Sequence, residues 1–215
     1  RTARVIFPAG TRAQVYDGAN WDFVTEPSMV QLTEFTTDAS GSDQMPGALP
    51  PTSDYTYAID LFIHQGVLKE NGIDVKFFDQ TGEASDVLFW EENFLGFPVG
   101  SRVPTGYYDD ERDTWVAVED GFFVEVTDIV DGKAVLNLGD RDAGALGITE
   151  EELAVVGGFA VIGESYMRVP FPHFSNMDCN HGSSPSPKGR PPGQGEPNDN
   201  DDDDCSSPLF GSIID

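Results

Sequence analysis

Short runs of alternating apolar and polar residues recur along most of this chain, with turn-forming residues between them. In the run YTYAIDLFI, for example, Tyr57, Ile59 and Leu61 share one face of an extended segment. The segments at 119–121 (EDG) and 130–133 (VDGK) are turn signals between later runs. Strands recurring about every eight to twelve residues are typical of a β-sandwich and not of a helical bundle. The sequence therefore predicts a mainly β fold.

The runs divide into two groups, which predict two small β-sandwich or β-barrel-like modules at residues 1–97 and 98–175. One short helix is expected in the second module, at about 149–156, because Thr149 is a good N-cap and Glu152 follows three residues later as in a capping box. From residue 176 to residue 215 the composition shifts to Pro, Gly, Ser and Asp. That composition predicts a disordered, low-complexity acidic linker.

The formal net charge is −26, from 38 acidic and 12 basic residues. Such a charge repels a phosphate backbone, so we predict no nucleic-acid partner. No apolar run approaches the roughly 18 residues of a membrane span, so no membrane insertion is expected. Two interpretations of the charge remain, solubility and Ca²⁺ binding. The acidic run of Asp199 and residues 201–204, with Glu196 nearby, fits a solvated tail.

One acidic segment has the spacing of a calcium loop. Asp140, Asp142 and Gly144 follow the D-x-D-x-G pattern, and Glu151 occupies the twelfth position, where an EF-hand places its bidentate carboxylate. Ala145 replaces the glycine expected at the sixth position. The candidate metal ligands are therefore Asp140, Asp142 and Glu151, with Ca²⁺ as the candidate cofactor and an acidic turn before a helix as the alternative.

The two cysteines, Cys179 and Cys205, form either one disulfide or two free thiols. The disulfide would enclose the low-complexity segment and stabilise the chain by roughly 3 kcal/mol. His173, Asp178, Cys179 and His181 also offer metal-ligand atoms, but their spacing matches no standard zinc pattern.

Enzyme motifs are absent from the sequence. It contains no G-x-S-x-G elbow, no P-loop and no dinucleotide-binding glycine motif. We therefore predict a protein that is not an enzyme and that has no catalytic residues. The aromatic side chains of Trp21, Trp90, Tyr107 and Trp115 could stack on a sugar, although packing in a core explains them equally well.

Several blocks resemble the segment just upstream of the repeats in bacterial RHS (YD-repeat) proteins. In chain order they are MPGALPPTSDYTYAIDL, ENFLGFPVGSRVPTGYYD, DGFFVEV, ALGITEEEL, MRVPFPHFSNMDCN and CSSPLFGSIID. They cover most of the chain from about residue 45 to residue 215.

The resemblance implies a secreted or cell-surface, toxin-associated protein. YD repeats build a large hollow β-shell, and segments ahead of them commonly form β-sandwich modules. In related proteins, including teneurins, such a segment plugs one end of the shell. Residues 176–215 would then lead into the shell, and the partner would be the shell of the same polypeptide or another protein.

The segment after residue 92 would join the two modules. Phe94, Leu95 and Phe97 have apolar surface to bury, and Gly96 permits a positive φ. The predicted joint and docking residues are Asn93, Phe94, Leu95, Phe97, Pro98, Tyr107, Tyr108 and Trp115. Plain core packing and docking on the shell are both consistent with these residue types.

Two functional hypotheses follow. The first is a non-enzymatic accessory, plug or docking region of a large secreted RHS protein. The second is a stand-alone module, Ca²⁺-dependent or not, that binds a carbohydrate or a cell-surface partner. A broad exposed apolar surface would favour the first, and an aromatic platform beside polar groups would favour the second.

Overall fold

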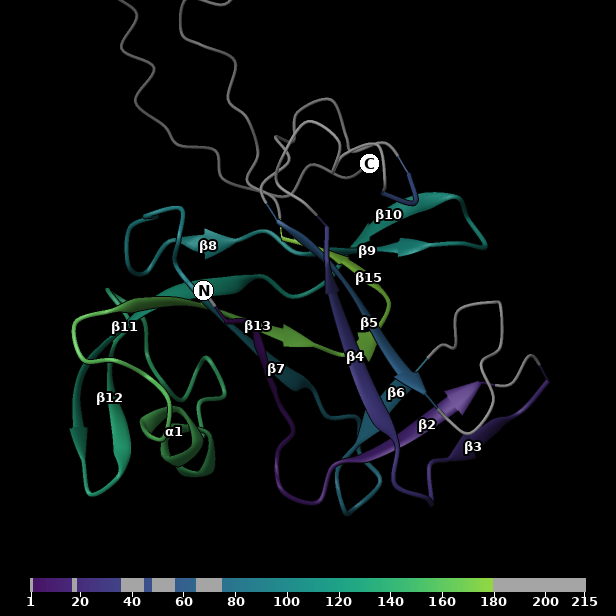
Figure 1. Cartoon of the computed structure of the whole chain (residues 1–215), viewed down its shortest axis with the longest axis horizontal. Coiled ribbons are helices and arrows are strands. Elements are labelled where there is room, and N and C mark those ends of the chain that lie inside the picture. Colours follow the sequence, from purple (N-terminus) through teal and green to yellow (C-terminus); the bar gives the residue numbers. More distant parts are fainter. Residues whose placement is uncertain (1, 17–18, 36–44, 48–56, 65–74, 180–215) are drawn as a thin grey trace, which may run out of the picture.

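The computed structural model describes residues 2–16, 19–35, 45–47, 57–64 and 75–179. Within these residues the chain is mainly β, with one helix and three antiparallel sheets (Figure 1). The mainly β fold class is therefore confirmed. The predicted disorder of the tail concerns residues 180–215, which lie outside the described residues.

The largest sheet has six strands. Its order is β1 (Arg4–Ile6), β7 (Val87–Glu92), β13 (Ser165–Phe171), β11 (Gly121–Val130) and β12 (Lys133–Asn137), and β8 (Arg102–Val103) also pairs with β11. The pairing of β7 with β13 sets Trp90 opposite Arg168.

The other two sheets have five and four strands. The five-stranded sheet has the order β10 (Thr114–Ala117), β9 (Gly106–Asp109), β15 (Asn176–Asp178), β5 (Ala58–His64) and β4 (Met29–Glu34). The four-stranded sheet has the order β14 (His173–Phe174), β6 (Val75–Phe78), β2 (Arg12–Tyr16) and β3 (Trp21–Phe23).

Hydrogen bonding joins strands from both sides of residue 97. In the six-stranded sheet β7 pairs with β13, in the five-stranded sheet β5 pairs with β15, and in the four-stranded sheet β6 pairs with β14. Each of the three sheets therefore contains strands from both sides of the predicted module boundary. The strand β15 lies within the segment expected to be a linker. This part of the segment is a strand of the sheet, and its apolar residue Met177 is completely buried in the core.

The main hydrophobic core lies between the six-stranded sheet and the two smaller sheets. It brings together Phe89 of β7, Ile59 of β5 and Phe77 of β6, all at most 1% exposed. Aromatic rings continue the contacts, since Phe89 stacks on Phe171 with ring centroids 5.4 Å apart. The strands β5 and β6 supply this core from one face by alternation, whereas β7 and β13 are buried on both faces.

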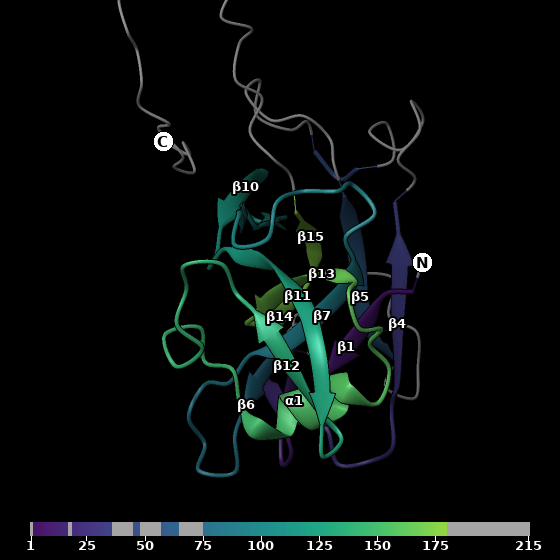
Figure 2. The same ribbon diagram turned by 90° about the vertical axis from the view of Figure 1, so that its left-hand side faces the viewer.

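The opposite face of the six-stranded sheet is covered by α1 (Glu150–Gly157). Figure 1 places α1 beside β12, on the side of the molecule away from β4, and Figure 2 views that side directly. Thr149 is the N-cap, and its Oγ1 accepts a hydrogen bond of 3.1 Å from the backbone N–H of Glu152. The predicted helix and its N-cap are confirmed.

Candidate functional site

The segment that follows β7 is a tight loop braced by one side chain. Nδ2 of Asn93 donates hydrogen bonds to the carbonyl oxygen of Phe97 at 2.8 Å and to Oγ of Ser165 at 3.0 Å. Its Oδ1 accepts from the backbone N–H of Phe97 at 3.0 Å. Asn93 thus closes the loop across four residues and ties it to the start of β13. We call residues 93–97 the Asn93 loop.

The far end of the Asn93 loop is fixed by packing. Phe97 stacks on Phe123 of β11 with ring centroids 5.2 Å apart, against the main core. Gly96 has a φ of +69°, a conformation that a residue with a Cβ rarely adopts. The carbonyl of Pro98 then accepts a hydrogen bond from the backbone N–H of Ser101, which turns the chain toward β8. The loop is therefore held at both ends.

The tip of the Asn93 loop remains on the surface. Phe94 is 38% exposed and Leu95 is 44% exposed, although both are large apolar residues. Phe94 also packs edge-on against Tyr57, with ring centroids 5.8 Å apart. Of the predicted joint residues, Phe97 is therefore packed against the core, while Phe94 and Leu95 are partly exposed.

Beneath the tip lies a hollow of about 10 Å³. It is lined by Tyr57, Glu92, Asn93, Phe94, Leu95, Phe123, Met167 and Cys179. Its volume is enough for about one water molecule, whereas pockets for small molecules span roughly 300–1,000 Å³. The hollow can hold a water but not a substrate.

The Tyr57 hydroxyl and the Cys179 thiol beside this hollow are held in their neutral forms. The Tyr57 hydroxyl donates a hydrogen bond of 2.9 Å to Oε1 of Glu34. Burial raises the pKa of Tyr57, and the carboxylates of Glu91 and Glu34 raise it further. Burial also raises the pKa of the Cys179 thiol, with a smaller contribution from Asp178. A neutral phenol and a neutral thiol are poor nucleophiles.

The aromatic residues that follow the Asn93 loop pack the hairpin of β9 and β10. Tyr108 and Trp115 are 7% and 5% exposed, and their ring centroids lie 5.3 Å apart in an edge-on arrangement. Tyr107 contacts the ring of His173 edge-on, with centroids 4.4 Å apart. Tyr108 and Trp115 are therefore core residues and do not form a docking surface.

The calcium-like segment forms a compact turn before α1. Oδ1 of Asp142 accepts a hydrogen bond of 3.0 Å from the backbone N–H of Ala145, so this carboxylate caps the turn. Asp140 is exposed, and so is Glu151 in the first turn of α1. Among the residues that the structure describes, no three His, Cys, Asp or Glu side chains gather where they could hold a metal ion.

The cysteine and histidine candidates are dispersed. Cys179 is buried, and it has no disulfide partner in the described part of the chain. Cys205 and His181 lie outside the described residues, so the predicted disulfide stays a prediction. Asp178 and Cys179 are consecutive in an extended segment and therefore point to opposite faces of their sheet.

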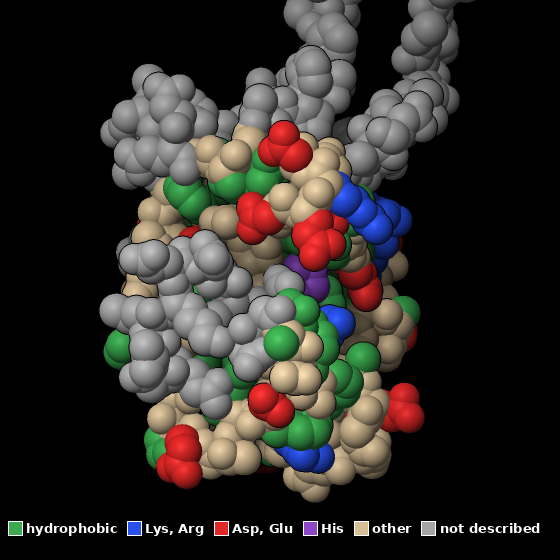
Figure 3. Space-filling view, turned by 90° about the vertical axis from the view of Figure 1, so that its right-hand side faces the viewer, with side chains coloured by type: hydrophobic (Ala, Val, Ile, Leu, Met, Phe, Trp, Pro, Cys, Tyr) green, Lys and Arg blue, Asp and Glu red, His purple; other side chains and the backbone are tan. Residues whose placement is uncertain are grey.

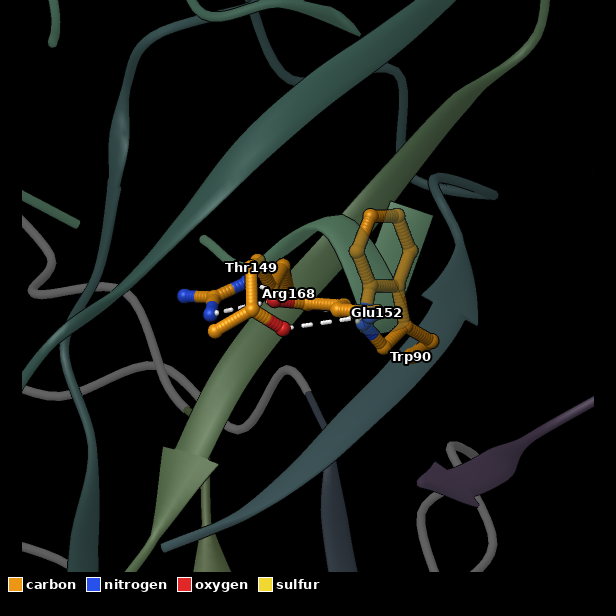
Figure 4. Close-up of polar contacts among 4 residues, drawn as sticks. All are labelled: Trp90, Thr149, Glu152 and Arg168. Carbon is orange, nitrogen blue, oxygen red and sulfur yellow. Dashed lines mark hydrogen bonds and ion pairs between the residues drawn. The ribbon is translucent and has the colours of Figure 1, made fainter. Parts of the chain in front are cut away.

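The sequence does not reveal that the acidic residues Glu152 and Asp178 are buried. Glu152 is 2% exposed and forms an ion pair with Arg168 on the helix side of the six-stranded sheet (Figure 4). Asp178 is 9% exposed, and burial raises its pKa to about 8. The run of three glutamates in the helix signals an acidic first turn, but not which of them is buried.

Comparisons with known proteins return no match: no family model, no curated protein and no solved structure is similar to this chain. No helix in the described segments has the length and apolar character needed to span a membrane.

Proposed function

We propose that this chain is a non-enzymatic docking region that binds a partner protein through the Asn93 loop. The observation that carries the proposal is the combination of a braced backbone with an exposed apolar tip. The three hydrogen bonds of the Asn93 side chain hold the loop, while Phe94 and Leu95 are 38% and 44% exposed.

The physical argument rests on the cost of binding. A flexible loop loses conformational entropy when a partner orders it, and a loop ordered in advance avoids most of that loss. A partly exposed aromatic and aliphatic pair is also the kind of anchor that fills a pocket on a partner. Covering both side chains would remove apolar surface from water, at about 25 cal/mol per Å².

The proposed partner is the YD-repeat shell of the same polypeptide. Supporting this are the sequence blocks that resemble the segment upstream of such repeats, one of which contains the Asn93 loop itself. In this proposal the protein is secreted or located at the cell surface. The region would then cap or plug one end of the shell and leave the chemistry to other domains.

The first experiment determines the coding sequence beyond Asp215. If YD repeats follow in frame, the repeat region is produced separately and its affinity for this chain is measured by isothermal titration calorimetry. Absence of such repeats would refute the proposed partner.

The second experiment tests the loop. Phe94→Ala with Leu95→Ala should weaken shell binding at least about tenfold, since each buried large side chain contributes more than 1 kcal/mol. The matched control is Val161→Ala with Ile162→Ala, because these residues are 57% and 54% exposed on the loop before β13. Equal weakening by both pairs, or by neither, would contradict a role of the Asn93 loop.

A further inference from the structure

The outer face of the four-stranded sheet carries a row of aromatic side chains. Tyr16 of β2 lies opposite Trp21 of β3, and their ring centroids are 5.3 Å apart. Phe23 of β3 and Phe78 of β6 extend the row, with ring centroids 6.1 Å apart. All four side chains are partly exposed.

Core packing does not account for these aromatic residues. The opposite face of the same sheet supplies the core with Val15, Val75 and Phe77, which are 4% exposed or less. Because side chains alternate along a strand, the aromatic row points away from that core. Figure 3 views the molecule from the side on which β3 lies in Figure 1, where hydrophobic side chains reach the surface with Lys and Arg side chains among them.

Two basic residues lie on the aromatic rings. The guanidinium carbon of Arg12 is 3.7 Å from the ring centroid of Phe23, and Nζ of Lys76 is 4.1 Å from the ring centroid of Trp21. Both side chains are exposed, and neither forms an ion pair with an acidic group in the described part of the chain.

This face thus combines flat apolar rings with hydrogen-bond donors. The guanidinium and the ammonium group carry only donors. Gln14, which lies opposite Lys76 and two residues from Arg12 along β2, adds both donors and an acceptor. Ring faces are electron-rich and attract C–H groups and cations. A ligand that fits must present weakly polar C–H surfaces and many hydroxyl oxygens.

We propose that this aromatic and basic face is a binding site for a neutral polysaccharide. The C–H faces of the sugar rings pack on the exposed surface of Tyr16, Trp21 and Phe23 that Arg12 and Lys76 leave uncovered, and hydroxyl oxygens accept hydrogen bonds from Arg12 and Lys76. The site is separate from the Asn93 loop and independent of the docking role proposed above.

Charge selects this occupant over the alternatives. The net charge of −26 repels nucleic acids and acidic polysaccharides at long range. A basic partner protein would be attracted to the acidic surface elsewhere on the molecule and repelled locally by Arg12 and Lys76. A neutral glycan pays neither electrostatic cost.

The test is affinity electrophoresis of the whole chain in native gels that contain one polysaccharide each. The probes are xyloglucan, galactomannan, hydroxyethyl cellulose and a soluble β-1,3-glucan, with polygalacturonate as the acidic comparison. We expect at least one neutral probe to retard the chain. Trp21→Ala should weaken that retardation at least about tenfold, as expected for the loss of a stacked ring and its contact area.

A second variant covers the case in which Trp21→Ala unfolds the edge strand. Lys76→Met keeps the long apolar side chain but removes the donor, so it should weaken binding while leaving the thermal unfolding temperature nearly unchanged. The matched control is Phe94→Ala with Leu95→Ala, which should leave retardation unchanged and so separates this site from the docking loop.

Tryptophan fluorescence provides an independent readout. Trp90 and Trp115 are 0% and 5% exposed, whereas Trp21 is partly exposed, so acrylamide quenching reports mainly on Trp21. A bound neutral polysaccharide should protect Trp21 from acrylamide. The proposal is overturned if no neutral probe retards the chain or protects Trp21, if only polygalacturonate binds, or if folded Trp21→Ala and Lys76→Met variants bind as the wild type does.

Discussion

Two buried carboxyl groups, Glu152 and Asp178, have opposite surroundings: the first is surrounded by hydrogen-bond donors and the second is not. Oε1 of Glu152 accepts hydrogen bonds from Trp90 Nε1 at 3.0 Å and Arg168 Nε at 2.7 Å, and its Oε2 accepts from Arg168 Nη2 at 2.9 Å. Oδ1 of Asp178 has no hydrogen-bond partner in the part of the chain that the structure describes. Glu152 is therefore held in an ion pair, whereas Asp178 is neutral at pH values below its pKa of about 8.

Strand register explains the difference. Trp90 and Arg168 lie opposite one another in β7 and β13, so they present two donors to the same point beneath α1. The N-cap of α1 uses the backbone N–H of Glu152, and the side chain of Glu152 turns inward to those donors (Figure 4). Asp178 lies between Ala58 of β5 and Gly106 of β9, neither of which has a polar side chain.

The largest effect is expected from Arg168→Met. This change leaves Glu152 buried without its cation, and breaking a buried ion pair in this way costs about 3–5 kcal/mol. Urea unfolding at pH 7 should show a midpoint reduced accordingly, with little change in the m-value.

The matched control is Lys133→Met, which removes the exposed pair between Lys133 Nζ and Glu150 Oε2, 2.7 Å apart. A surface pair contributes about 0–1 kcal/mol, so this variant should unfold almost as the wild type does. Adding Glu152→Leu to Arg168→Met should restore most of the lost stability, because it removes the unpaired charge. Equal decreases in the free energy of unfolding for Arg168→Met and Lys133→Met would show that the buried ion pair contributes no more than the exposed one.

The next effect concerns Asp178→Asn and depends on pH. Burial raises the pKa of Asp178 from its usual 3.8 to about 8, so between these values the folded chain holds a proton that the unfolded chain has released. The contribution of this group to stability is therefore fully present below about pH 4, and it is lost as the pH rises through about 8. The asparagine variant carries no such titration.

We expect Asp178→Asn to exceed the wild type in free energy of unfolding by about 2 kcal/mol at pH 8.5, the order of the cost of a buried unsatisfied polar group. The difference should shrink steadily toward pH 4.5. Urea unfolding of both proteins at intervals across this range measures it. A difference that is constant with pH, or that grows toward acid, would contradict the raised pKa.

Local signals account for the features that the sequence predicted. Thr149 followed by Glu152 is enough to place the helix start, and the alternation in YTYAIDLFI is enough to place β5 and its buried face. The reciprocal capping-box bond, from the backbone N–H of Thr149 to the side chain of Glu152, was not formed. The Glu152 side chain instead accepts hydrogen bonds from Trp90 and Arg168.

Non-local pairing accounts for what the sequence did not predict. Periodicity identifies the buried face of a strand but not its neighbour, so the pairing of β7 with β13 across the expected module boundary left no signal. Burial of Asp178 likewise depends on β5 and β9, which are distant in sequence. The sequence also did not decide whether Phe94 and Leu95 are buried or exposed, because core packing and docking require the same residue types.

The smallest effect tests whether the helix N-terminus and the buried ion pair act together. Thr149→Ala removes the side-chain acceptor for the backbone N–H of Glu152, which should cost about 1 kcal/mol, while Thr149→Ser should cost only a fraction of that. Both are measured by urea unfolding at pH 7. If the cap also positions Glu152 for Arg168, the losses from Thr149→Ala and Arg168→Met will be less than additive in the double variant, by more than about 0.5 kcal/mol. Strict additivity would instead mean that the register of β7 and β13 positions the ion pair without help from the cap.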